Sequence, residues 1–148
     1  MRTGLSLISV LMSAGALGAE LPREAAEVAL ASLIADDRDS KDIVYCISIE
    51  EKDASPETLA KLQRPDRVIV AGSKCRFVFD PARGSYEIAS KKRAYIVSVA
   101  HPQWVSPSAL TLELARRHSG KWAYGWTARL EFRDGHWRLL GKSNDWVS

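Results

Sequence analysis

Residues 122–139 contain two apolar runs joined by Asp134-Gly135, and this pattern restricts the fold more than any other stretch of the chain. An Asp-Gly pair between alternating apolar runs is a strong signal for a two-residue β-hairpin turn. Closing the turn there pairs Arg133 with His136, Phe132 with Trp137, Glu131 with Arg138 and Leu130 with Leu139. This register gathers the apolar side chains on one face, whereas a shift by one residue would scatter them over both.

The rest of the chain predicts two helices and several further strands. The first helix covers residues 22–35, because Pro22 suits the first helical position and Glu24 favours the positive N-terminal end. The second begins at Ser55-Pro56, with Ser55 as the N-cap. Alternating or β-rich stretches predict strands over residues 43–49, 68–71, 74–79, 93–100 and 109–118, and His101-Pro102 is expected to end the strand over 93–100.

Helices that precede a long run of strands are typical of α+β domains. We therefore predict an α+β fold in which a curved antiparallel sheet carries the N-terminal helix across its concave face. A chain of 148 residues suits one domain, which we place at residues 20–148.

Residues 1–19 have the order of a secretory signal peptide: a positive charge, an apolar run, then small residues. The apolar run over residues 5–17 is shorter than the ~20 residues that a membrane-spanning helix needs. Cleavage after Ala19 is our first choice, and cleavage after Ala16 or Gly18 stays open. An uncleaved N-terminal anchor is the alternative. The mature protein is expected in the periplasm or outside the cell, with no membrane span.

The chain has two cysteines, Cys46 and Cys75, and both follow the predicted signal. An even number of cysteines in an exported chain indicates a disulfide. A catalytic or metal-binding pair is the alternative, but there is no CxxC spacing and the three histidines are scattered.

The C-terminal third resembles the ends of a group of uncharacterised exported bacterial domains of the NTF2-like and cystatin-like α+β type. The resemblance is carried by Gly125, by the hairpin Asp134-Gly135-His136-Trp137 and by the terminal Trp146-Val147-Ser148. It implies a curved sheet with a helix packed on it and an exported setting. It implies no activity, because folds of this kind host many functions.

No motif in the sequence indicates catalysis. The chain lacks HExxH, GxSxG and GxGxxG, and the stretch over residues 135–143 has the wrong glycine spacing for a phosphate loop. We expect no catalytic residue, no metal and no cofactor. The net charge of +3 is too small to indicate nucleic-acid binding.

Two features of the C-terminal region could form a binding surface. All five tryptophans lie at position 104 or later, which indicates either an aromatic-lined pocket or carbohydrate platform, or packing in the sheet core. Trp104, in a predicted loop over residues 101–107, and Trp146 are the candidates for exposure. Arg129, Arg133 and Arg138 share the polar face of the hairpin, which is either a site for an anionic partner or a solvated face with Glu131 interleaved.

We therefore expect a non-catalytic exported domain that binds another envelope component, either a protein or an anionic polymer. The candidate binding residues are Arg129, Arg133, Arg138 and Trp104. One alternative is a small NTF2-like enzyme or small-molecule binder that uses the cone between helix and sheet. Another is a purely structural or inhibitory module.

Overall fold

The computed structural model describes residues 20–36 and 42–148, so the predicted signal peptide lies outside the described residues. The described residues form two α-helices, one 3-10 helix and nine strands. In chain order these are α1 (Arg23–Asp36), β1 (Val44–Ile49), β2 (Lys52–Asp53), α2 (Pro56–Leu62), β3 (Val68–Ala71), η1 (Gly72–Lys74), β4 (Cys75–Arg76), β5 (Tyr86–Glu87), β6 (Ala94–Ser106), β7 (Ala109–Ser119), β8 (Trp122–Arg133) and β9 (His136–Val147). None of the described helices is long and apolar enough to cross a membrane.

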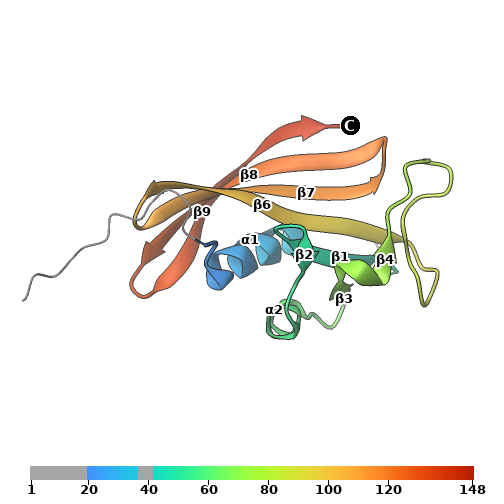
Figure 1. Cartoon of the computed structure of the whole chain (residues 1–148), viewed down its shortest axis with the longest axis horizontal. Coiled ribbons are helices and arrows are strands. Elements are labelled where there is room, and N and C mark those ends of the chain that lie inside the picture. The colour runs from blue at the N-terminus through green and yellow to red at the C-terminus, as the bar shows by residue number, and fades with distance from the viewer. Residues whose placement is uncertain (1–19, 37–41) are drawn as a thin grey trace, which may run out of the picture.

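The main sheet has the order β2-β1-β6-β7-β8-β9, with β3 also paired to β1 (Figure 1). Strands β6 to β9 form an antiparallel meander, but β1 runs parallel to both β3 and β6. The α+β class is confirmed, and the prediction of an antiparallel sheet is wrong for β1. Both parallel partners are reached through long crossing connections, which is what parallel pairing requires. The sheet is open.

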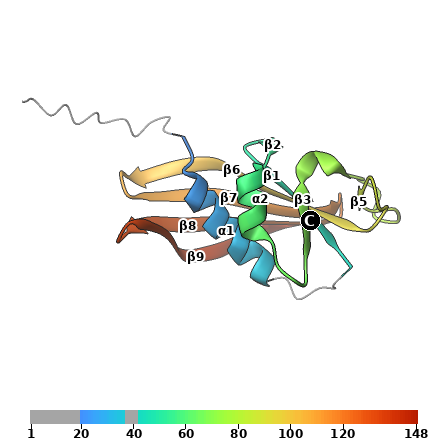
Figure 2. The same cartoon turned by 90° about the horizontal axis from the view of Figure 1, so that it is seen from below.

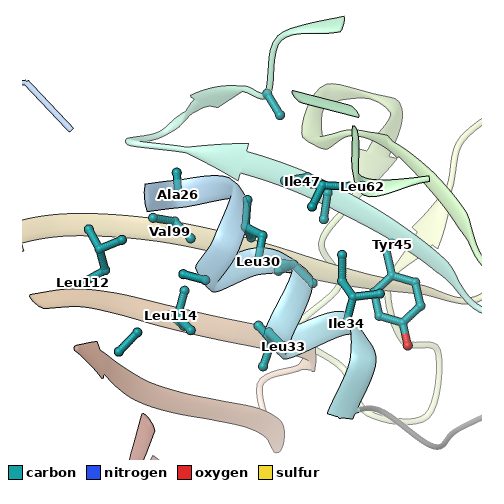
Figure 3. Close-up of a cluster of buried hydrophobic side chains, with 14 of the residues drawn as sticks. Ala26, Leu30, Leu33, Ile34, Tyr45, Ile47, Leu62, Val99, Leu112 and Leu114 are labelled. Atoms are coloured by element: carbon teal, nitrogen blue, oxygen red, sulfur yellow. The ribbon is translucent and has the colours of Figure 1, made fainter. Parts of the chain in front are cut away.

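Helix α1 packs across one face of the sheet, which we name the helix face; the opposite face is the outer face (Figures 1 and 2). Leu30, Leu33 and Ile34 of α1 lie among the buried side chains of the strands, including Val99, Leu112 and Leu114 (Figure 3). Burying each such side chain contributes about 1.5–3 kcal/mol. The apolar side chains of α1 and those of β7 therefore pack in one core.

The hairpin register is confirmed in every pair. Arg133 pairs with His136, Phe132 with Trp137, Glu131 with Arg138 and Leu130 with Leu139. The N-cap of α2 is confirmed as well, because the Ser55 hydroxyl accepts a hydrogen bond from the Thr58 amide at 3.2 Å.

Two strand boundaries differ from the prediction. His101-Pro102 does not end its strand, since β6 continues to Ser106 through an irregularity between Ala100 and Gln103. His101 takes a left-handed backbone with φ of 52°, which lets the chain accommodate Pro102 and resume pairing. The strand predicted over residues 74–79 is confined to β4, and Phe77 and Phe79 lie exposed beyond it.

The segment 72–93 is attached to the outer face of the sheet. Val44, Cys46 and Ala94 form a small second core there, against which Cys75 packs. The predicted disulfide between Cys46 and Cys75 is present, with the two Cα atoms 6.2 Å apart. In the chain-entropy model a crosslink over 29 residues stabilises the fold by about 3.6 kcal/mol.

Candidate functional site

The space between α1 and the sheet, where an NTF2-like pocket was expected in the alternative hypothesis, is occupied by core side chains (Figure 3). Glu27 is the only buried carboxylate of the described residues and is 6% exposed. Thr58 donates a hydrogen bond to it at 2.9 Å, and Arg23 and Lys61 form ion pairs with it. These contacts give Glu27 a structural role in joining α1 to α2.

The three candidate arginines lie exposed on the outer face, as the hairpin register requires. Glu131 lies between them, and Arg138 forms an ion pair with Asp134 at 3.6 Å. Trp104 is not near them: it belongs to β6 on the helix face, where its ring centroid lies 5.7 Å from that of Trp137. The prediction of an exposed loop tryptophan at position 104 is therefore wrong, because the strand continues past Pro102.

The positive charge of the protein is concentrated in another place. Residues 74–93 contain six Lys or Arg and two Asp or Glu, which gives this segment a formal charge of +4. The whole chain carries +3, so the remaining 128 residues sum to −1. The segment lies at the end of the sheet beside the β7–β8 turn (Figure 1). An anionic ligand would therefore be attracted to this end of the molecule.

A pocket of about 400 Å³ lies between this segment and the sheet, and we name it the cationic pocket. Its lining residues are Pro81, Ala82, Arg83, Arg93, His118, Ser119 and Trp122. Neither Arg83 nor Arg93 forms an ion pair within the described ranges. Two guanidinium groups without a carboxylate partner can hold a carboxylate, sulfate or phosphate group by charge-assisted hydrogen bonds.

A tight turn holds Arg83 at this pocket. The amides of Arg83 and Gly84 donate to the carbonyl of Asp80, at 3.2 and 2.9 Å. Gly84 has φ of +69° and lies so close to the His118 ring that a Cβ would overlap it. Glycine is therefore required there, both for the backbone conformation and for the close approach.

The floor of the cationic pocket is held together by hydrogen bonds. The amide of Ser85 donates to the His118 carbonyl at 2.8 Å, and the amide of Ala94 donates to the Ser85 carbonyl at 3.0 Å. The His118 Nδ1 atom lies 3.0 Å from the Ala94 carbonyl oxygen. Because a carbonyl only accepts, Nδ1 carries the hydrogen in this contact. The imidazole thereby fixes the start of β6, which directly follows Arg93, against the end of β7.

Trp122 forms one wall of the pocket. The sequence predicts Trp122 in the sheet core. The residue lies on the same face as Leu130, but it is 41% exposed. Its position as the first residue of β8 places it at the end of the sheet. Its ring stacks with that of Tyr95 at a centroid distance of 6.4 Å. An exposed indole beside two guanidinium groups offers an apolar surface to a ring that carries an anionic group.

Sequence reasoning did not identify Arg83 or Arg93. The available signal was the turn Asp80-Pro81-Ala82-Arg83-Gly84 followed by the basic run over residues 91–93, which together make the segment basic. The contribution of His118 and Trp122 had no local signal, because β7 and β8 reach the segment only in the folded chain. Within the described residues, no group of three or more His, Cys, Asp or Glu side chains could hold a metal ion.

Comparisons of the chain with protein-family models, with curated proteins and with solved structures find no match. The resemblance to NTF2-like domains therefore stays a prediction, and the function is argued from the site itself.

Proposed function

We propose that this protein is a non-catalytic exported domain that binds an anionic component of the cell envelope, either a protein or a polymer, through the cationic pocket. The observation that carries this proposal is that Arg83 and Arg93 line one pocket together with His118 and Trp122. Their positive charges have no carboxylate partner among the described residues, and the surrounding segment holds the surplus charge of the chain.

The location of the pocket supports binding rather than catalysis. The imidazole of His118 is buried and its Nδ1 is engaged by a backbone carbonyl, so its clear role is to position the pocket wall. The guanidinium groups are exposed, as suits recognition of a ligand that arrives from solvent. The disulfide that anchors the segment is compatible with an exported protein, because such bonds persist in oxidising compartments.

The pocket can be tested with two small probes, glucuronate and inorganic phosphate. The His118 ring and the Trp122 indole N–H are followed by NMR during titration of each probe. We expect saturable shifts at both groups with the wild-type protein, weaker at higher salt because exposed charges are screened. The double variant Arg83→Ser/Arg93→Ser should lose these shifts.

The matched control is Arg133→Ser/Arg138→Ser, which removes the same charge from exposed positions on the hairpin. This control should bind both probes as the wild type does. If the hairpin variant loses binding and the pocket variant keeps it, the site lies on the hairpin and the proposal is wrong. Equal losses in both variants would show a general charge effect and would also contradict it.

Export is tested by intact-mass analysis of the protein recovered from the periplasm. We expect a mature chain that starts near Glu20 and carries no reactive thiol. A retained Met1, or two thiols that react with a labelling reagent, would overturn this part of the proposal.

A further inference from the structure

The outer face of the sheet carries a groove of about 630 Å³, which we name the outer groove. Its floor is a row of small residues paired across three neighbouring strands. Ser48 of β1 pairs with Ser98 of β6, and Ser98 pairs with Ala115 of β7. Because these three side chains are short, the surface of the sheet is open along the row. Two strand spacings separate Ser48 from Ala115, so the floor is about 10 Å long.

Trp146 closes the outer groove where the same row reaches β8 and β9. Ala115 pairs with Gly125 of β8, and Gly125 pairs with Trp146 of β9. A Cβ at position 125 would overlap the indole, so the ring lies against the glycine at the end of the row. The ring is 41% exposed, and the Arg117 guanidinium lies 5.7 Å from its centre. The groove therefore ends in an apolar wall that carries one positive charge.

Three carboxylates line the outer groove: Glu51, Glu113 and Asp145. Glu113 and Asp145 come together in the next row of the sheet, because Glu113 pairs with Thr127, whose hydroxyl donates a hydrogen bond to Asp145. Within residues 20–36 and 42–148, the one basic group near these carboxylates is His101, at 3.8 Å from Glu113. None of the three forms an ion pair with a lysine or arginine of the described ranges.

The charges of the outer groove select the ligand. Its three carboxylates and the Arg117 guanidinium sum to −2 when His101 is neutral, which attracts a cation, whereas the cationic pocket attracts an anion. Arg117 has no carboxylate partner in the described part of the chain. A polyamine would meet this guanidinium as a like charge and offer it no acceptor. A peptide with a basic side chain offers both a cation and backbone carbonyls that accept hydrogen bonds.

We propose that the outer groove binds an extended peptide segment of a partner protein that carries a lysine or arginine side chain. Extended backbone advances about 3.4 Å per residue, so about three residues fill the floor. The basic side chain pairs with Glu113 and Asp145, the backbone lies over Ser98 and Ala115, and a carbonyl accepts from Arg117. This inference goes beyond the proposed function and does not depend on it, because the site is different and the ligand has the opposite charge.

The test uses pentapeptides with blocked ends, in which alanine occupies the first, third and fifth positions. The other two positions are both lysine, both glutamine or both glutamate. NMR follows the indole N–H of Trp146 during titration. We expect a saturable shift with the lysine peptide that weakens as salt is raised, because exposed charges are screened. The glutamine and glutamate peptides should bind at least tenfold more weakly.

The double variant Glu51→Gln/Glu113→Gln tests the charge of the outer groove. Neither carboxylate accepts a hydrogen bond in the described fold, and both side chains are exposed. We expect this variant to bind the lysine peptide at least tenfold more weakly than the wild type. The matched control, Glu57→Gln/Glu131→Gln, removes the same charge from positions outside the groove and should bind as the wild type does.

The variant Ala115→Leu tests the shape of the outer groove without changing any charge. A leucine at this position fills the floor, so binding of the lysine peptide should be lost. Thr111→Leu adds a similar side chain on the same strand, outside the groove, and should leave binding unchanged. Amide spectra show whether each variant keeps the native fold, and Ser98→Leu fills the same row if Ala115→Leu does not fold.

The outcomes separate this inference from the proposed function. Arg83→Ser/Arg93→Ser should keep wild-type affinity for the lysine peptide, since the cationic pocket takes no part. Equal binding of the glutamine peptide, or equal losses in the two glutamate double variants, would overturn the inference. Normal binding by a folded Ala115→Leu variant would place the peptide elsewhere and overturn it too. If spermidine or chitotriose binds as tightly as the lysine peptide, the ligand is a polyamine or a sugar and the inference is wrong.

Discussion

The indole of Trp146 lies directly on Gly125 of the neighbouring strand, so closely that a Cβ at position 125 would overlap the ring. Gly125 therefore sets where the ring rests on the outer face, where Trp146 lines a groove of about 630 Å³ together with Ser98 and Ala115. The glycine is in ordinary extended backbone, so its requirement is one of space rather than of conformation.

Gly125→Ala should lower the free energy of unfolding by about 1–3 kcal/mol, because the ring or the strand must move. The control is Gly141→Ala, whose Cβ would meet only the far end of the Arg129 side chain, at 2.8 Å from a guanidinium nitrogen. That flexible group can move aside, so we expect a loss below about 0.5 kcal/mol. Urea denaturation compares the two, and equal losses would contradict the assigned role of Gly125.

Trp137→Ala should destabilise the protein by about 3–5 kcal/mol, because this ring is 8% exposed and its loss leaves a cavity beside Trp104. Arg133→Ala, four positions away across the turn, should change stability by less than about 0.5 kcal/mol. Denaturant unfolding of both variants tests the assignment of faces. Similar values for the two would show that the hairpin faces are assigned incorrectly.

The turn between β1 and β2 consists of Glu50 and Glu51, both in the left-handed backbone region with φ of 50° and 65°. Asparagine followed by glycine fits such a turn much better. We expect Glu50→Asn/Glu51→Gly to raise the unfolding free energy by about 1 kcal/mol. Asp134→Asn is the control. Its turn already has the favoured Asp-Gly pair, so the unfolding free energy should change little. Thermal melts compare the two variants with the wild type.

A higher unfolding free energy for the Glu50→Asn/Glu51→Gly variant would show that this left-handed turn is strained. Unchanged stability would show that the left-handed residues cost nothing here.

Asp53 has a lowered pKa, because the side chain and the backbone amide of Ser73 donate hydrogen bonds to its carboxylate. A carboxyl whose pKa is lower when folded stabilises the fold above its unfolded pKa, and this contribution is lost as the pH falls through the folded pKa. Asp53→Ala should therefore be less stable than the wild type at pH 7. The difference should shrink below about pH 4, and a difference that is constant with pH would contradict the linkage.

The hairpin and α2 were predictable because their signals are local. The register around Asp134-Gly135 follows from the alternation of eight neighbouring residues. The N-cap at Ser55 follows from the four residues Ser55-Pro56-Glu57-Thr58. The parallel pairing of β1 could not be predicted in this way. It joins Tyr45 to Tyr95, fifty residues apart, and depends on the path of the chain between them.

The cationic pocket was missed for the same reason. Its walls come from the turn at Arg83, from the start of β6 and from the β7–β8 region, which are separate in sequence. The prediction for Trp104 was wrong for the opposite reason, because it relied on a local rule, that proline ends a strand. Pro102 predicts the end of a strand, yet the left-handed His101 lets β6 continue, and Trp104 packs against the core of the helix face.

The disulfide makes the basic segment a separable part of the molecule. Strands β6 to β9 and α1 form their core on the helix face, whereas residues 74–93 rest on the outer face and are secured there by Cys75 and by the backbone contacts of Ser85. Exposed side chains of this segment, such as Arg83 and Phe79, can therefore be substituted without loss of contacts in the main core. The same arrangement makes the segment a natural point for engineering, where a loop of different charge could be grafted between Cys75 and Ala94.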